Sequence, residues 1–198
     1  MAAESVNHGR RRFLTASTVV VGGVGGVFAA IPFIAAWKPN AKAVAAGAPV
    51  TADISKLAVG EQLTIAWRGR PIFIVRRSEA MLAALPAEDA RLKDPQSTVV
   101  DQQPEFAKNG YRSLKPDILV LVGSCTHLGC SPKLHTEVQP EPWDSQWKGG
   151  YYCPCHNSRF DLAGRVYDGS PAPTNLVVPP YRFESDTRVV IGESEGAA

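Results

Sequence analysis

The sequence predicts a mainly β protein in which an antiparallel β domain follows a single membrane-spanning helix. Three observations lead to this prediction. One long uncharged run lies near the N-terminus, short β-rich runs separated by turn residues follow it, and all four cysteines fall between Cys125 and Cys155. The 198 residues suffice for one globular domain with an appendage.

The apolar run extends from Phe13 to Trp37 and contains no charged residue. A helix of that length reaches roughly 37 Å, more than the roughly 30 Å hydrocarbon core of a bilayer. Its glycines and its proline are common in transmembrane helices. We therefore predict a retained membrane anchor over residues 13–38. A cleaved signal peptide is the alternative, although its apolar region is usually only about 7–15 residues long.

Three arginines, Arg10, Arg11 and Arg12, stand directly before Phe13 and Leu14. This pattern resembles a twin-arginine export signal, which sends folded, cofactor-loaded proteins across a membrane; a plain charge cluster is the alternative. Residues 1–43 hold five of the 21 basic and one of the 19 acidic residues. The positive-inside rule therefore predicts a cytoplasmic tail over residues 1–12 and a domain on the far side of the membrane.

Residues 39–50 are small, rich in alanine and nearly uncharged. We predict a flexible hinge here, with an ordinary linker as the alternative. The residues after position 43 carry 16 basic and 18 acidic side chains without a basic stripe. Nucleic-acid binding therefore has no electrostatic support.

The domain over residues 51–198 shows strand and turn signals. Residues 62–67 and 71–76 predict a hairpin around Arg68-Gly69-Arg70. Residues 78–85 predict one short helix, with Ser78 as its N-cap and Pro86 as its end. The remaining predictions are an irregular stretch over residues 94–110, a buried strand over 116–123, a strand at 151–152 and a hairpin from 181–183 and 189–191.

Two of the predicted strands lead into loops that carry cysteine and histidine. The first loop runs from Cys125 to Cys130 and contains His127, and the second runs from Cys153 to Ser158 and contains Cys155 and His156. A structural zinc needs four ligands, fewer than the six candidates present. Disulfides alone would leave both histidines unexplained. A two-iron, two-sulfur cluster held by one cysteine and one histidine from each loop would leave one cysteine per loop for a disulfide.

The motifs Cys-Thr-His-Leu-Gly-Cys and Cys-Pro-Cys-His-Asn-Ser resemble the two boxes of Rieske iron–sulfur proteins. The resemblance implies one [2Fe–2S] cluster with Cys125 and Cys153 on one iron and His127 and His156 on the other. It also implies a disulfide between the two remaining cysteines, Cys130 and Cys155. The implied fold is a Rieske-type antiparallel β-sandwich with an inserted cluster-binding subdomain at about residues 117–180.

The extra cysteine pair resembles that of the respiratory branch of the family, and the segment Gly169-Ser170-Pro171-Ala172-Pro173 resembles the proline loop that covers the cluster in that branch. That branch is the bacterial-type iron–sulfur subunit of ubiquinol–cytochrome c reductase. The resemblance implies electron transfer from quinol to a c-type cytochrome in a proton-translocating complex of the inner membrane. It implies a periplasmic cluster domain, with cytochrome b, cytochrome c1, quinol and membrane lipid as partners. A small Rieske subunit of a periplasmic oxidase, such as arsenite oxidase, is the alternative function, and a zinc module is a third.

The resemblance also implies roles for residues around the cluster. His156 would contact the quinol, Leu128 would shield the cluster, and the Ser158 hydroxyl would bond a bridging sulfide. Phe160 stands where many relatives have a tyrosine that bonds a cysteine sulfur, so we expect a lower midpoint potential. Asn157 stands where glycine is usual, which predicts a positive φ angle.

Three further residues lie between the two boxes. We expect His135 to be a surface residue rather than a ligand. Trp143 and Trp147 are expected to pack this segment, with an exposed partner contact as the alternative.

Overall fold

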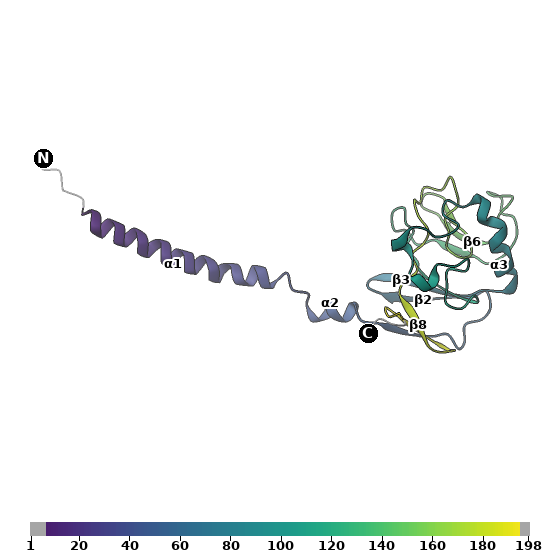
Figure 1. Ribbon diagram of the computed structural model, residues 1–198, viewed down its shortest axis with the longest axis horizontal. Helices are drawn as coiled ribbons and strands as arrows, with labels where there is room; N and C mark the ends of the chain where they lie inside the picture. Colours follow the sequence, from purple (N-terminus) through teal and green to yellow (C-terminus); the bar gives the residue numbers. More distant parts are fainter. Residues whose placement is uncertain (1–6, 195–198) are drawn as a thin grey trace. The chain divides into compact units, whose positions relative to one another are not determined.

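The computed structural model describes residues 7–194. The chain divides after Ala45 into an N-terminal unit and a globular unit (Figure 1). The N-terminal unit contains the helix α1 (His8–Ala35) and most of the short helix α2 (Ala41–Ala46). Residues 1–6 of the predicted tail lie outside the described residues.

The long helix α1 covers most of the predicted anchor, but it begins earlier and ends sooner than predicted. Asn7 caps it, because its Oδ1 accepts a hydrogen bond from the backbone N–H of Arg10 at 3.1 Å. The three arginines of the predicted tail therefore form its first turns. The helix ends at Ala35, since Pro39 disfavours helical backbone in the residue before it. Within the described residues, α1 is long and apolar enough to cross a bilayer.

The predicted hinge over residues 39–50 is not wholly irregular. It contains α2, and Asn40 Oδ1 accepts a hydrogen bond from the backbone of Ala43 at 2.8 Å. Its last residue, Val50, already begins the first strand of the globular unit. Alanine is the best helix former, which accounts for a helix in this Ala-rich segment. Flexibility of the segment stays a prediction.

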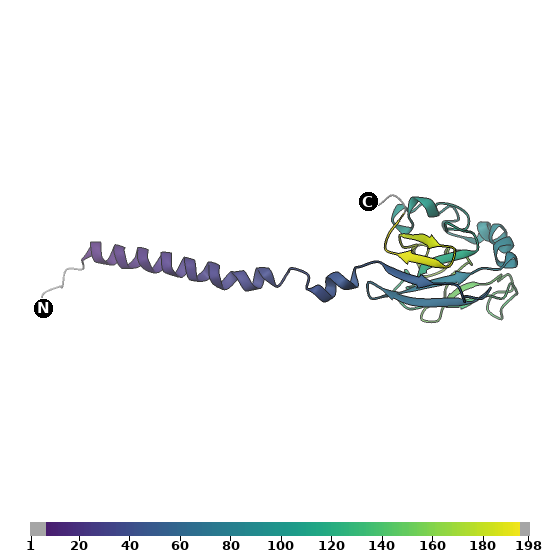
Figure 2. The same ribbon diagram turned by 90° about the horizontal axis from the view of Figure 1, so that it is seen from below.

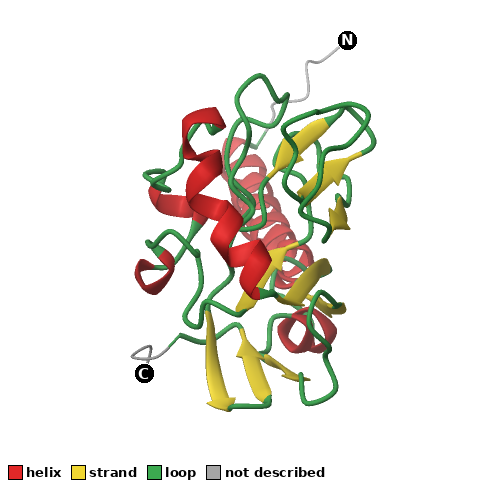
Figure 3. Ribbon diagram, turned by 90° about the vertical axis from the view of Figure 1, so that its right-hand side faces the viewer, coloured by secondary structure: helices red, strands yellow, loops and turns green. Residues whose placement is uncertain are grey.

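The globular unit is mainly β, as predicted. In its described part, nine strands form three small sheets, ordered β1-β9-β8, β2-β3-β4 and β5-β6-β7. All strand pairs in these three sheets are antiparallel, and Figure 3 shows the strands in yellow among long green loops. The strands are β1 (Val50–Asp53), β2 (Gln62–Trp67), β3 (Arg70–Arg76), β4 (Ile118–Val122), β5 (Lys133–His135), β6 (Gly150–Cys153), β7 (Ser158–Phe160), β8 (Tyr181–Ser185) and β9 (Arg188–Ile191).

The two predicted hairpins are present. The chain turns between β2 and β3 at Arg68 and Gly69, which both have positive φ angles of 50° and 71°. A two-residue turn with two positive φ angles matches the right-handed twist of the paired strands. The second hairpin joins β8 to β9 through Asp186 and Thr187. Figure 2 shows this hairpin in yellow, and its strand β9 pairs with β1.

The predicted short helix is α3 (Glu79–Ala84), and the Ser78 hydroxyl caps it by accepting from Met81 N–H at 3.2 Å. The α-helix ends before Pro86, as predicted, with Leu85 as its C-cap. The chain continues as the 3₁₀ helix η1 (Leu85–Arg91), because proline in a first turn has no N–H to satisfy. The stretch predicted as irregular contains two further 3₁₀ turns, η2 (Val100–Gln102) and η3 (Glu105–Ala107).

The central strand pair β3–β4 supports the loops that carry the cysteines. All five residues of β4 are buried, and β4 delivers the chain to Cys125. Phe73 of β3 stacks on Tyr151 of β6, with ring centroids 6.0 Å apart. Gly123 makes room for this ring, since a Cβ there would lie 2.4 Å from the tip of Phe73. The sheet β5-β6-β7 is thus packed against the sheet β2-β3-β4 through this ring stack. Close packing of this kind makes the support of the second cysteine loop rigid.

Candidate metal centre

The first cysteine loop curls back on itself. The backbone N–H of Cys125 donates to the carbonyl of Cys130 at 2.7 Å, and Gly129 N–H donates to the carbonyl of Cys125 at 2.8 Å. Gly129 closes the loop with a φ angle of 83°. Cys125 is therefore buried, His127 half-buried, and Leu128 70% exposed at the tip.

The second loop is the turn of the β6–β7 hairpin. The last strand pair is Cys153 with Ser158, and Asn157 N–H donates to the Cys153 carbonyl at 3.0 Å. Asn157 has a φ angle of 61°, which confirms the expected positive value. The hairpin buries Cys153 and leaves Cys155 and His156 exposed at its tip.

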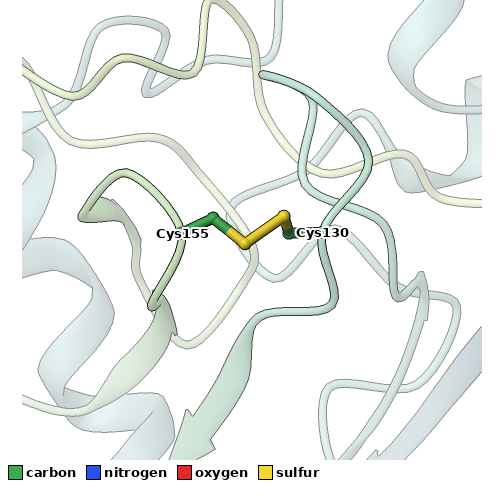
Figure 4. Close-up of a disulfide and its surroundings, with 2 residues drawn as sticks. All are labelled: Cys130 and Cys155. Atoms are coloured by element: carbon green, nitrogen blue, oxygen red, sulfur yellow. A yellow bond between two sulfur atoms is a disulfide. The ribbon is translucent and has the colours of Figure 1, made fainter.

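The structure brings the two loops together. Cys130 and Cys155 form the disulfide that the resemblance implied, and Figure 4 shows it joining one loop to the other. The rings of His127 and His156 lie 4.7 Å apart, edge to face. The two cysteines outside the disulfide, Cys125 and Cys153, are both free and buried. Six of the predicted site residues therefore meet at one place on the domain.

The remaining donor atoms fit a metal cluster. Nδ1 of His127 is buried without a hydrogen-bond partner among residues 7–194, a costly state that metal coordination relieves. Burial raises the pKa of the Cys125 thiol, while a hydrogen bond with the backbone of His127 opposes the increase. Two thiols and two imidazoles are the ligand set of a Rieske centre. The sulfurs of Cys130, Cys153 and Cys155 also lie within 4.8 Å of one another, but the disulfide leaves only Cys153 free to bind zinc as a thiolate.

The segment of residues 169–174, which includes the predicted proline loop, is bonded to both cysteine loops. The Ser158 hydroxyl accepts from Ala172 N–H at 3.1 Å, and the Thr126 hydroxyl donates to the carbonyl of Thr174 at 2.7 Å. Pro171 and Pro173 are exposed, and Gly169 has a φ angle of 72°. The proline loop is therefore held against the site by one hydroxyl from each box. The role of Thr126 was not predicted, although the residue lies inside the first motif.

Two other predicted residues, Phe160 and Leu128, differ in burial. Phe160 is fully buried in β7, two residues from Ser158 and hence on the same face of the strand. Leu128 does not pack into the core, since most of its side chain is exposed. Its shielding role stays a prediction.

His135 is not a plain surface residue, contrary to expectation. It is half-buried, its Nδ1 lies 3.2 Å from Glu141 Oε1, and its ring meets those of Trp143, Trp147 and Tyr152 edge to face. Trp147 is 1% exposed and packs the segment between the boxes as expected. Trp143 is 38% exposed, so packing covers only part of it.

Sequence reasoning missed two buried arginines that hold the chain after β7. Arg77 donates to the carbonyl of Leu162 at 3.2 Å, and Arg112 donates to the carbonyls of Ala163 and Gly164 at 3.1 and 3.3 Å. Burial lowers the pKa of both guanidinium groups to about 10, so both remain charged at neutral pH. Isolated arginines in a sequence carry no signal of burial.

Two family models match the chain. The model described as "Rieske [2Fe-2S] domain" matches residues 48–182. The model described as "Ubiquitinol-cytochrome C reductase Fe-S subunit TAT signal" matches residues 1–40. The fold and the paired loops thus define a Rieske iron–sulfur protein with an export signal.

Similar curated proteins assign the chain to a narrower family. The ubiquinol–cytochrome c reductase iron–sulfur subunit of Allochromatium vinosum is 54% identical over 100% of this chain and 95% of the relative. The subunit of Bradyrhizobium diazoefficiens is 41% identical over 96% of this chain and 98% of the relative. That of Blastochloris viridis is 42% identical over 92% of each chain. The chain belongs to the Rieske iron–sulfur subunits of ubiquinol–cytochrome c reductase, which are electron-transfer proteins with one [2Fe–2S] cluster.

Proposed function

We propose that the chain accepts electrons from quinol at its [2Fe–2S] cluster and passes them to a c-type cytochrome within a proton-translocating respiratory complex. The observation that carries this proposal is the exposed His156, which lies 4.7 Å from the half-buried His127 on a surface where both cysteine loops meet. Relatives named for ubiquinol and cytochrome c support it over almost their whole length.

The four ligands are Cys125 and Cys153 on one iron and His127 and His156 on the other. Both cysteines are buried and free, and His127 has an unpartnered ring nitrogen. When bound, the cluster supplies one-electron chemistry at about −150 to +300 mV, because neutral imidazoles replace two thiolates. This range lies well above the roughly −400 mV of plant-type ferredoxins and suits an electron acceptor for quinol.

His156 is the ligand that a substrate can reach. Its side chain is exposed at the tip of the β6–β7 hairpin, whereas His127 is half-buried. An exposed imidazole can accept a hydrogen bond from a quinol hydroxyl and hold the proton that leaves with the electron. His156 is therefore the residue that binds and orients the quinol.

The partners are cytochrome b, cytochrome c1, quinol and membrane lipid, and the chain lies in the inner membrane of a bacterium. The apolar helix α1 supports a single-pass anchor, and the arginines at its start support a cytoplasmic N-terminus. The disulfide supports a periplasmic cluster domain, since the periplasm is oxidising. Salt washing should leave the chain in the membrane fraction, and detergent should release it.

The alternative, a small subunit of a periplasmic oxidase, is not favoured. The three relatives are named as subunits of the reductase and match 92% to 100% of this chain.

Complementation tests the proposal. Membranes from a bacterial strain that lacks its own reductase iron–sulfur subunit should regain quinol-dependent cytochrome c reduction when they receive this chain. They should also regain a Rieske-type electron paramagnetic resonance signal. A Cys125→Ser variant, which lacks one predicted ligand, should restore neither. A chain that restores the signal without the activity would contradict the proposed electron path.

A further inference from the structure

The hairpin that carries His156 is held by a side-chain contact outside the predicted ligand set. Tyr152 of β6 lies opposite Arg159 of β7, so the two side chains share one face of the hairpin. From this face the Tyr152 hydroxyl donates a hydrogen bond to Oδ1 of Asn157 at 2.5 Å. Asn157 directly follows His156 in the turn.

Asn157 serves the turn in two ways. Its backbone adopts a φ angle of 61° and donates to the Cys153 carbonyl at 3.0 Å. Glycine would adopt this left-handed conformation at least as easily, but it has no side chain. The contribution specific to asparagine is therefore its hydrogen bond with Tyr152.

Tyr152 is itself fixed by a second aromatic ring. Trp143 stacks on it with centroids 4.7 Å apart and planes 29° apart. The next residue, Asp144, accepts hydrogen bonds from Arg159 at 2.8 Å and from Arg91 at 2.6 Å, and its side chain is only 6% exposed. The ion pair between Asp144 and Arg159 therefore holds the segment that contains Trp143 against the β6–β7 hairpin.

We propose that Trp143, Tyr152 and Asn157 form a brace that fixes the position of His156. All three line one surface pocket together with His156. His156 lies between two anchored neighbours, because the disulfide holds Cys155 on one side and the brace holds Asn157 on the other. The three residues are positioning residues, which act on His156 through the turn. The consequence for catalysis rests on the proposed function, in which His156 binds the quinol.

Two variants in the intact complex remove the hydrogen bond without removing the turn. Tyr152→Phe keeps the ring that stacks on Trp143, and Asn157→Gly keeps the left-handed backbone. Tyr111→Phe is the matched control, since it removes the hydroxyl of a tyrosine that is 43% exposed and outside the site. The two readouts are the line width of the electron paramagnetic resonance spectrum of the reduced cluster and the KM for quinol.

Both variants should broaden the spectrum, because a less constrained histidine ligand samples more orientations around the iron. KM should rise about two- to tenfold, the range that the loss of one hydrogen bond gives. The double variant should be no worse than the more affected single variant, since both changes break the same bond.

A spectrum of Tyr152→Phe as narrow as that of Tyr111→Phe would overturn the brace, whatever the KM. Additive effects in the double variant would also overturn it. A broadened spectrum with an unchanged KM would support the brace and count against the quinol contact at His156, so the two proposals fail separately.

Discussion

Residue 160 is phenylalanine where many Rieske proteins of the resembled type have tyrosine. Phe160 is fully buried and faces the same side of β7 as Ser158, which bonds the proline loop. A tyrosine hydroxyl there would add one hydrogen bond to a cysteine sulfur and stabilise the reduced cluster. One bond of about 1 kcal/mol corresponds to about 40–50 mV, at about 59 mV per tenfold change.

We expect Phe160→Tyr to raise the midpoint potential by about this amount in a redox titration. Phe183→Tyr is the control, since Phe183 lies in β8 outside the cysteine loops and should leave the midpoint unchanged. A midpoint that stays constant or falls in Phe160→Tyr would refute the assigned role.

Cys130 and Cys155 are linked across a sequence separation of 25 residues. Closing a loop of this length restricts the unfolded chain and stabilises the fold by about 3.5 kcal/mol. Replacing both cysteines with serine should lower the free energy of unfolding by about that amount in denaturant titrations. The titrations should compare the oxidised protein with the variant in the same detergent. Equal midpoints of unfolding would show that the disulfide contributes nothing to stability.

At the scale of elements, Arg77 ties the end of β3 to three other parts of the domain. It donates to the carbonyls of Pro116, Tyr111 and Leu162 and to the hydroxyl of Ser113. No carboxylate is among these partners. The guanidinium fork therefore works as a set of hydrogen-bond donors that a single ammonium group cannot reproduce.

We expect Arg77→Lys to destabilise the protein by about 3–5 kcal/mol, because carbonyls and a buried charge lose partners. Arg70→Lys is the matched control, since Arg70 is exposed at the start of the same strand and should cost little. Thermal unfolding of both variants measures the difference. A Tm for Arg77→Lys equal to that of Arg70→Lys would disprove this role.

The sequence predicted best those elements whose signal is local. The β2–β3 hairpin follows from Arg68-Gly69 between two apolar runs, and the cap of α3 follows from Ser78. The three-residue strands β5 and β7 are too short to show a period.

The site could be predicted because its residues lie in two compact motifs. The residues that support the site could not be predicted. Thr126, Tyr152 and Arg112 act through partners that only the tertiary structure places beside them. The half-burial of His135 has the same explanation, because its aromatic neighbours come from other parts of the chain.

At the scale of the whole molecule, several buried tyrosines make the fold sensitive to alkali. Burial raises the pKa of Tyr181 to about 12 and also raises those of Tyr151 and Tyr167. Between pH 10 and 12 the folded state keeps a phenolic proton that the unfolded chain loses. The contribution of the Tyr181 phenol to the free energy of unfolding is therefore fully present below pH 10 and is lost as the pH rises to about 12.

We expect the free energy of unfolding to fall by up to about 3 kcal/mol through Tyr181 across this window. Tyr181→Phe should flatten this part of the pH profile, whereas Tyr111→Phe should not, since Tyr111 is exposed. Denaturant titrations from pH 9 to 12 measure it. A profile of Tyr181→Phe as steep as that of the unaltered chain would contradict the assignment.

The pairing of β1 with β9 has a consequence for how the protein is made. The first strand of the domain forms all four of its residue pairs with the last one, from Val50 with Ile191 to Asp53 with Arg188. During synthesis β1 leaves the ribosome long before its partner exists, and such distant pairing is slow to form. The sheet β1-β9-β8 can therefore form only once both ends of the domain have been synthesised. This pairing of the two ends of the domain suits the twin-arginine type of signal matched at residues 1–40, because that type of signal exports proteins that have already folded.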